Sequence, residues 1–539
     1  MPRWGMADSA RSPGAASAGA DLPPANVLRG PSGTKNNIIA ANMLPSTATP
    51  TLPRRRFLRD LGRCLGAGGI LTSSTFLNLG RGQTTVASAP APAPAAGDIE
   101  SLEHLGEFVR ECTLPGETRR DDVVPRHANC IQVARARWLV IYSTHGYRGV
   151  DDERSIIYQL RRDAPDGAVI KEGFLARSAA NWLPAGVPPP PAGKVYFKQH
   201  GHMVAFGVPK GAVIGGQPAR SANLFVAQWR VLGRVLEVQR DFLDKIYADM
   251  ALFRATQGVE QIQFRLNDRD DDLEILQPAT RLRQKGFATG PAFCSADAEW
   301  MNQTFCPAVP VNAERTEWAE CNHFDRGRIA ALKHQFNPAT GRYEWTALGP
   351  FLGDARRPLS EASLVRLADG WLVAARGSGQ ITWARATDPF TAWSDLTLTK
   401  EPAVSAPLTA FRCGDGVVRL FTGDKAASPQ RYDRDPLYCW DVQPDRDFAV
   451  SQRREIYSST ASRPPFRLAV RPKIDFCELF PHHGRTQLIV HGVSTRAFNH
   501  PYDGQPGIPI LNAAEKSTSG LYVARLTYRT APPPLWNFA

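Results

Sequence analysis

Short apolar runs of strand length recur along residues 97–539, and each ends at a polar turn. The runs are rich in Val, Ile and aromatic residues and are bounded by Gly, Asp or Pro, which is typical of β-strands. The clearest examples are 138–142, 203–206, 371–374, 417–421 and 488–490. The wide spacing of these runs leaves room for further strands between them. The repetition predicts an all-β protein, a β-propeller whose blades are four-stranded sheets.

One segment breaks this pattern. Between residues 231 and 254 apolar side chains recur at every third or fourth position, at Leu243, Ile246, Met250 and Phe253. That spacing is typical of an amphipathic helix. We therefore expect a helical insertion near 231–254, between two blades, that serves as a packing element or as a lid.

A basic cluster precedes the strand-rich part. Residues 54–59 read Arg-Arg-Arg-Phe-Leu-Arg, and a weakly apolar stretch follows at 61–79. A twin arginine followed by Phe-Leu resembles the twin-arginine export signal of bacteria. The alternative is a chance basic cluster in a disordered tail, since short motifs carry false positives. We expect 54–96 to be this signal and an Ala/Pro linker, with cleavage between residues 89 and 97.

The signal interpretation sets the expected location of the protein. Export by the twin-arginine route would deliver it to the periplasm or the exterior of a bacterial cell. Membrane contact is expected only through an uncleaved signal that remains as an anchor. Residues 1–53 are rich in Pro, Ala and Ser and lack periodicity, so they are expected to be a disordered extension, with Met43 as a candidate start of translation.

Composition and charge narrow the class of protein. The chain is 43% hydrophobic and 22% charged, which is the balance of a soluble globular protein. Residues 1–96 hold ten Lys and Arg and three acids, so +7 of the net charge of +12 lies there and only +5 remains for 97–539. So diffuse a charge argues against nucleic acid as a partner.

Two turns carry a recognisable motif. Residues 386–393 read Ala-Thr-Asp-Pro-Phe-Thr-Ala-Trp and resemble a degenerate Asp-box, Ser-x-Asp-x-Gly-x-x-Trp, in which Asp388 and Trp393 keep their separation. The turn at 337–341, followed by Trp345, is a looser relative. Because Asp-boxes (BNR repeats) recur in the blades of sialidases, the chain resembles that family. The resemblance implies a six-bladed propeller, and 97–539 is the expected domain.

Three further segments resemble the active-site elements of sialidases, in the family's order. Arg126 opens a strand, and Asp151 and Asp152 follow on a loop 25 residues later. Glu361 and Arg376 flank an apolar hairpin with an Asp-Gly turn, which returns the chain so that both can end on one side of the sheet. Arg434 precedes a Pro-Leu strand.

The resemblance also implies roles. Arg126, Arg376 and Arg434 would clamp a substrate carboxylate through planar, charge-assisted bonds. Asp151 or Asp152 would act as acid and base. Glu361 would be the base for a Tyr nucleophile.

By spacing from Arg434, Tyr457 is the candidate nucleophile. By strand context the position falls at 474–477, which holds no Tyr.

Each of these residues has a structural alternative. The arginines could be charges at blade edges, Asp151 and Asp152 a solvated turn, and Tyr457 a core residue of a strand. Trp300, Asn322 and His323 belong to aromatic and polar clusters of the kind that line sugar sites.

Neither a metal nor a cofactor is expected. No Cys-x-x-Cys pair occurs, and the His-Gly-His pair at 200–202 has no third ligand nearby in the sequence.

The pattern as a whole predicts an exo-acting glycoside hydrolase, sialidase-like, whose partner is a glycan with an acidic sugar. Two alternatives stay open. One is a propeller glycosidase that uses Glu361 with Asp151 or Asp152 as two direct carboxylates. The other is a non-catalytic propeller that binds glycans, because one fold hosts unrelated functions.

Overall fold

The structure is a computed structural model of the chain. It describes residues 98–121, 123–146, 153–183, 187–207, 213–214, 217–218, 224–237, 252, 258–281, 308–312, 314–324, 327–399, 402–404, 408–427, 434–459, 473–494 and 519–533. The chain divides into two units, Met1–Ser88 and Ala89–Ala539, and every described residue belongs to the second. The proposed export signal therefore lies outside the described residues.

Six antiparallel sheets make up the second unit, and we call them blades 1 to 6. Blade 1 holds β2 (Val123–Ala134), β3 (Arg137–Gly146), β4 (Glu153–Arg162) and β5 (Val169–Ala176). Blade 2 holds β6 (Ala179–Ala180), β7 (Lys194–Gly207), β10 (Phe225–Glu237), β11 (Gly258–Leu266) and β12 (Leu273–Arg281). Blade 3 holds β13 (Val309–Pro310), β14 (Glu317–Phe324), β15 (Arg328–Asn337) and β16 (Arg342–Leu348).

The remaining blades follow the same order of strands. Blade 4 holds β17 (Ser360–Arg366), β18 (Trp371–Arg376), β19 (Ile381–Ala386) and β20 (Thr397–Thr399). Blade 5 holds β21 (Thr409–Arg412), β22 (Val418–Gly423), β23 (Leu437–Gln443) and β24 (Ala449–Tyr457). Blade 6 holds β25 (Lys473–Leu479), β26 (Thr486–Ser494), β27 (Gly520–Tyr528) and β1 (Ile99–Val109). A small hairpin of β8 (Val213–Ile214) and β9 (Gln217–Pro218) and a short 3₁₀ turn, η1 (Arg119–Asp121), complete the described elements.

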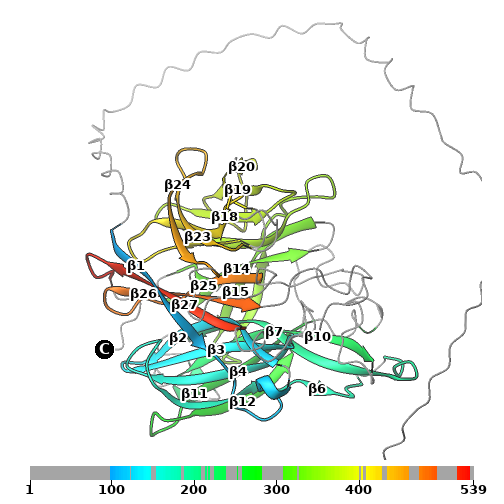
Figure 1. The fold of residues 1–539 in the computed structure, drawn as a ribbon. Helices are drawn as coiled ribbons and strands as arrows, with labels where there is room; N and C mark the ends of the chain where they lie inside the picture. Colours follow the sequence, from blue (N-terminus) through cyan, green and yellow to red (C-terminus); the bar gives the residue numbers. More distant parts are fainter. Residues whose placement is uncertain are drawn as a thin grey trace, which may run out of the picture. The chain divides into compact units, whose positions relative to one another are not determined.

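Blade 6 joins the two ends of the propeller. Strand β1 is its outermost strand and pairs antiparallel with β27, so that Ile99 lies opposite Tyr528. Figure 1 shows the blue β1 beside the red β27. The ring is therefore closed by main-chain hydrogen bonds between the first and the last described strand, and β27 has a pairing partner on each side.

Buried side chains join each blade to the next. Aromatic contacts are prominent: Phe206 of blade 2 lies 5.3 Å from Trp318 of blade 3, and Trp383 of blade 4 stacks on Phe448 of blade 5 at 5.1 Å. Further apolar clusters join blades 1 and 2, 3 and 4, 5 and 6, and finally 6 and 1. Each of the six sheets packs against the next, and the sixth packs against the first. The protein is therefore a six-bladed β-propeller, as predicted.

All six blades contribute to one central cavity. This cavity of about 400 Å³ is lined by residues of β2, β7, β13, β17 and β21 and by Leu479 of β25, and also by Trp318 of β14 and Gln487 of β26. We call β2, β7, β13, β17, β21 and β25 the inner strands. Within the part of the chain that the structure describes, no helix is long and apolar enough to cross a membrane.

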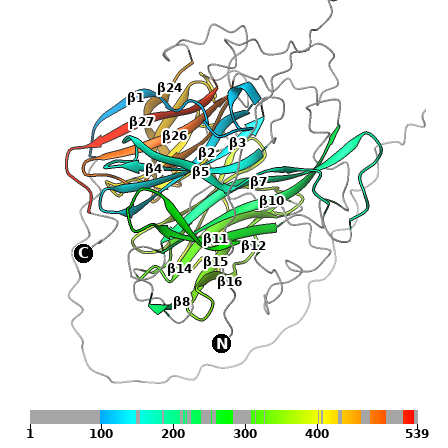
Figure 2. The ribbon, with the colours of Figure 1, turned by 90° about the horizontal axis from the view of Figure 1, so that it is seen from below.

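The expected helical insertion is wrong at its beginning. Residues 231–237 belong to β10, where they pair with 194–200 of β7. Figure 2 shows β7 and β10 side by side. The pairing partner satisfies the backbone groups that a helix would satisfy internally. The separation along the chain runs from 31 residues for Val231 and His200 to 43 for Glu237 and Lys194, outside any local window. Of residues 238–257, only Leu252 is described, and it is helical.

The two motif-bearing turns are held by their own side chains. The carboxylate of Asp388 accepts the N–H of Phe390 at 2.9 Å, and the side-chain oxygen of Asn337 accepts the N–H of Ala339 at 2.9 Å. Trp393 packs partly buried against the core between blades 3 and 4. These residues stabilise turns and packing, which is the local role expected of them.

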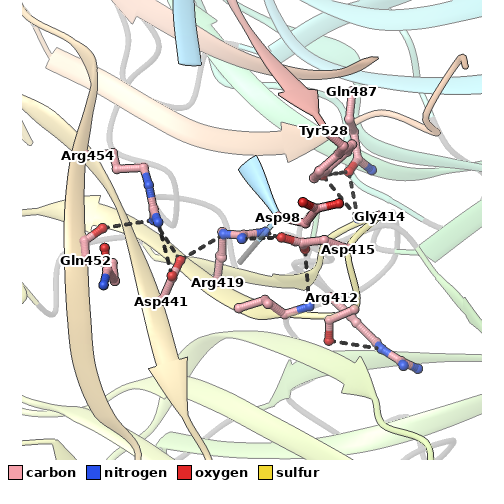
Figure 3. Close-up of polar contacts among 12 residues, drawn as sticks. Asp98, Arg412, Gly414, Asp415, Arg419, Asp441, Gln452, Arg454, Gln487 and Tyr528 are labelled. Carbon is pink, nitrogen blue, oxygen red and sulfur yellow. Dashed lines mark hydrogen bonds and ion pairs between the residues drawn. The ribbon is translucent and has the colours of Figure 1, made fainter. Parts of the chain in front are cut away.

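A buried ion network fixes blade 5. Arg419 is fully buried on β22, where Asp415 and Asp441 bind its guanidinium at 2.7 and 2.9 Å. Arg454 of the outer strand binds the same Asp441 at 2.8 Å, as Figure 3 shows. The carboxylates raise the pKa of Arg419 although burial opposes them. The network has a structural role, because every charge in it is paired within the blade.

Candidate active site

Two inner strands begin with a β-bulge that contains or adjoins a predicted site residue. In β2, Arg126 pairs with Ser143 and Ala128 with Tyr142, so His127 is the extra residue, at φ 46°. In β17, Glu361 is extra in the same way, at φ 42°. A left-handed backbone at a residue other than glycine costs about 1–3 kcal/mol and gathers at functional sites, where bulges redirect side chains.

Arg434 shares this unusual backbone. It lies three residues before the first residue of β23, at φ 48°, and is 1% exposed. The next residue, Asp435, accepts the backbone N–H of Ser459 at 2.9 Å and also the Ser459 hydroxyl. These bonds fix the segment that carries Arg434 against the end of β24.

Glu361 and Arg376 face each other across the predicted hairpin. Nη1 of Arg376 lies 2.6 Å from Oε2 of Glu361, and the two side chains are 26% and 16% exposed. The turn closes through the N–H of Leu367 and the carbonyl of Gly370 at 2.8 Å, and a Cβ on Gly370 would lie 2.6 Å from the carbonyl oxygen of Ala386. The hairpin therefore holds a carboxylate and a guanidinium together while both keep some access to solvent.

The three predicted arginines share one electrostatic environment. Burial lowers the pKa of Arg434, the charge of Glu361 opposes this, and the charges of Arg376 and Arg126 lower it further. Arg126 is itself only 4% exposed. Side chains of blades 1 and 4 therefore act electrostatically on Arg434 of blade 5. Guanidiniums brought under mutual influence in this way are the groups that bind a carboxylate through charge-assisted hydrogen bonds.

A polar cluster that the sequence did not reveal supports the bulge in β2. The Ser143 hydroxyl donates to the carbonyl oxygen of Arg126 at 2.7 Å and lies 3.0 Å from Nε2 of His145. Across the blade boundary, Oε1 of Glu478 lies 3.6 Å from Nδ1 of His127, and its other oxygen accepts the N–H of Ala128 at 3.4 Å. Blade 6 thus holds the backbone on which Arg126 sits.

Glu478 is an acid placed among apolar neighbours. Burial raises its pKa well above the ordinary value, and the bond from Ala128 offsets this only partly. A glutamate within the run Ile-Asp-Phe-Cys-Glu-Leu at 474–479 was the available signal, since an acid in a central strand needs a partner.

Tyr457 lies among packed rings. It ends β24, the outer strand of blade 5, and is 1% exposed. Its ring centroid is 5.0 Å from that of His491, 5.3 Å from that of His104 and 5.5 Å from that of Tyr522, all three from blade 6. This is the environment of a side chain that joins two blades.

The segment expected from strand context lies instead on the inner strand β25. Its Cys477 is buried and interacts electrostatically with Arg434, and burial raises the pKa of the thiol.

The remaining predicted residues divide into two groups. Asn322 is fully buried on β14 and donates to Glu320 at 2.9 Å, while the neighbouring His323 is half-buried. Asp151, Asp152 and Trp300 lie outside the described residues. Strand β3 ends at Gly146 and β4 begins at Glu153, at the end of blade 1 where Arg126 pairs with Ser143.

Metal ligation has no support in this part of the molecule. In the described ranges, no group of three or more His, Cys, Asp or Glu side chains could hold a metal ion.

Comparison with known proteins gives a likeness in structure alone. Neither a family model nor a curated protein matches the sequence. A mutant of Trypanosoma rangeli sialidase displaying trans-sialidase activity is similar at TM-score 0.46 and 11% identity, over 80% of this chain and 60% of that one. NanB sialidase from Streptococcus pneumoniae is similar at 0.38 and 12%, over 81% and 71%. Hadza microbial sialidase Hz136 is similar at 0.43 and 8%, over 75% and 66%.

The extent of the likeness is limited. The chain spans 54% of the length of Trypanosoma rangeli sialidase, at TM-score 0.43 and 9% identity. What the protein does therefore has to be argued from its own residues.

Proposed function

We propose that the protein is a propeller glycosidase that acts on an acidic sugar, with Arg126, Arg376 and Arg434 as the clamp for the sugar carboxylate. The observation that carries the proposal is that the charges of Arg376 and Arg126, from two other blades, both act on the buried Arg434. Gathering like charges where water is scarce is unfavourable unless an anion offsets it, and planar guanidiniums bind carboxylates through paired, charge-assisted hydrogen bonds. Perturbed charges of this kind cluster at functional sites.

The chemistry we propose uses carboxylates. Glu361, oriented by Arg376, takes a proton from the attacking water, and Asp151 or Asp152 protonates the leaving oxygen. One observation favours this chemistry of two carboxylates over a Tyr nucleophile. The ring of Tyr457 is packed between His491, His104 and Tyr522. The substrate carboxylate would stay in the arginine clamp throughout.

The location of the protein remains part of the proposal. Arg54 and Arg55 would direct export through the twin-arginine route, so that the enzyme meets glycans outside the cytoplasm. Replacing both with Lys should keep the precursor in the cytoplasm, and normal export of that variant would reject this route.

A panel of aryl glycosides tests the function. The purified protein should hydrolyse glycosides of sialic or uronic acids and leave the matched neutral sugars intact. Hydrolysis of neutral sugars alone would reject the acidic substrate. Binding of acidic glycans without hydrolysis of any glycoside would instead indicate a non-catalytic propeller.

A further inference from the structure

A second chamber lies further along the propeller axis than the candidate active site. Arg126 and Glu361 lie near the beginnings of β2 and β17. The cavity of about 400 Å³ is lined by 129–131 and 364–366, which lie further along the same two strands. None of the predicted site residues lines it among the described positions. It is therefore distinct from the arginine clamp.

The chamber combines an apolar wall with positive charge. Ile131, Trp318 and Phe480 contribute to the wall. Arg315, Arg366 and Arg412 also line it, and the described lining contains no Asp, Glu or Lys. At about 30 Å³ per molecule of liquid water, the volume corresponds to roughly 13 waters, far more than the small voids that packed interiors leave.

The neighbours of Arg366 and Arg412 do not neutralise them. Nη1 of Arg366 donates to the carbonyl oxygen of Val311, and its guanidinium lies 4.9 Å from the ring centroid of Trp371. Nε of Arg412 donates to the carbonyl oxygen of Gly416 at 3.3 Å. Within the described residues, neither arginine forms an ion pair with a carboxylate.

The acid nearest to Arg412 in the sequence binds another arginine. Asp415 binds Arg419 at 2.7 and 2.5 Å, and Figure 3 shows the Arg412 side chain turned away from it. Arg315 adds a third charge, and burial lowers its pKa to about 10, so it stays protonated at neutral pH. The described lining thus carries the positive charges of Arg366 and Arg412 beside apolar side chains and holds no acid.

We propose that this chamber binds an amphipathic anion, with an acyl or aryl body against the apolar wall and a carboxylate or sulfonate held by Arg366 and Arg412. Pockets of roughly 300–1,000 Å³ with mostly apolar walls and a few convergent polar groups are typical of small-molecule sites. The apolar wall supplies affinity through burial of hydrocarbon, and the arginines select for the anionic head group.

A matched pair of fluorescent probes tests the proposal on the full-length protein. 8-Anilinonaphthalene-1-sulfonate carries a sulfonate, and N-phenyl-1-naphthylamine has the same rings without the charge. The sulfonate probe should bind saturably, one per chain, at least about tenfold more tightly than the neutral probe, and dodecanoate should displace it while dodecanol should not. Equal affinity of the two probes would overturn the proposal.

Substitutions locate the binding site. Arg366→Gln and Arg412→Gln should each weaken sulfonate binding by roughly 10- to 100-fold, the range expected for one charge-assisted hydrogen bond. Arg412 is exposed, so its variant should fold even if Arg366→Gln, which loses the contact with Trp371, does not. The exposed Arg385 of blade 4 gives the control variant Arg385→Gln, which should bind normally.

A last variant separates this site from the proposed enzyme. Arg376→Gln should leave probe binding intact, because Arg376 does not line the chamber. If Arg376→Gln abolished binding while Arg412→Gln had no effect, the anion would occupy the clamp and the second site would be rejected. A loss of glycosidase activity in Arg376→Gln would test the arginine clamp and not the second site.

Discussion

The ion pair between Glu361 and Arg376 at 2.6 Å joins the bulged residue of an inner strand to the last residue of the next strand. The bulge sets the direction of the carboxylate, and the hairpin sets the position of the guanidinium. In the proposed enzyme the pair has two separable functions, since Arg376 would bind substrate and Glu361 would move a proton.

Arg376→Lys should weaken substrate capture. Lysine keeps the charge but cannot form the two parallel bonds of a guanidinium, so we expect a loss of about 1–3 kcal/mol in transition-state stabilisation, seen mainly in KM. Steady-state kinetics on an acidic aryl glycoside measures this. Arg385→Lys, at an exposed site on the same blade, is the control. An unchanged kcat/KM would remove Arg376 from the clamp.

Glu361→Gln should lower turnover instead. The amide keeps the shape of the side chain but cannot take a proton, so kcat should fall about 10²- to 10⁴-fold while KM changes little. Circular dichroism should show the fold unaltered. If kcat stayed the same in a correctly folded variant, Glu361 would not be the base.

Tyr457→Phe distinguishes the two forms of the proposed chemistry. The ring contacts with His491, His104 and Tyr522 persist in the variant, so activity should be nearly unchanged. Tyr457→Ala should cost about 3–5 kcal/mol of stability, because it leaves a cavity between blades 5 and 6. Loss of turnover in a stable Tyr457→Phe protein would restore the nucleophile hypothesis.

Asp441→Ala should strongly destabilise blade 5. The variant removes a carboxylate that binds both Arg419 and Arg454, and breaking a buried pair costs about 3–5 kcal/mol. Urea unfolding measures the change. Asp445→Ala, whose side chain is 86% exposed and pairs with Arg385, should change the free energy of unfolding by less than about 0.5 kcal/mol. Similar losses in both variants would contradict the structural role of the network.

Glu478→Gln should alter the pH dependence of stability. Burial raises the pKa of Glu478 in the folded protein, so the unfolded chain ionises first as the pH rises above its ordinary value. The free energy of unfolding therefore falls as the pH rises, by up to about 1.4 kcal/mol per pH unit, until Glu478 ionises in the folded protein as well. The variant should lose less stability than the natural protein between pH 4 and 8. Glu274→Gln, at an exposed ion pair, is the control, and its stability should depend on pH as that of the natural protein does. The same parallel curves for Glu478→Gln would contradict the prediction.

The features predicted from the sequence are those encoded locally. Each strand has its own apolar pattern, and the hairpin from Glu361 to Arg376 lies within one continuous stretch, so its ion pair needs no knowledge of the rest of the fold. The strand at 231–237 escaped prediction because its partner, 194–200, is distant in the sequence. The same applies to Glu478, which supports the bulge of another blade, and its partners become visible only when blades 6 and 1 meet.

Residue counting and strand context give different positions for the candidate nucleophile. Tyr457 has the expected distance from Arg434 in sequence, yet it ends an outer strand, whereas 474–477 fall on or next to the axis strand β25. Counting cannot distinguish an outer strand from an inner one, because loop lengths between blades vary.

The pairing of β1 with β27 also constrains how the protein is made. On the ribosome, β1 emerges first and has no partner until residues 520–528 have been synthesised. A prematurely terminated chain would therefore leave the edge of blade 6 exposed, and an exposed edge readily pairs with another chain. Contacts between such distant residues also slow folding. Strand β27 thus makes the closure of the propeller depend on synthesis of residues 520–528, because only then can β1 form its pairs.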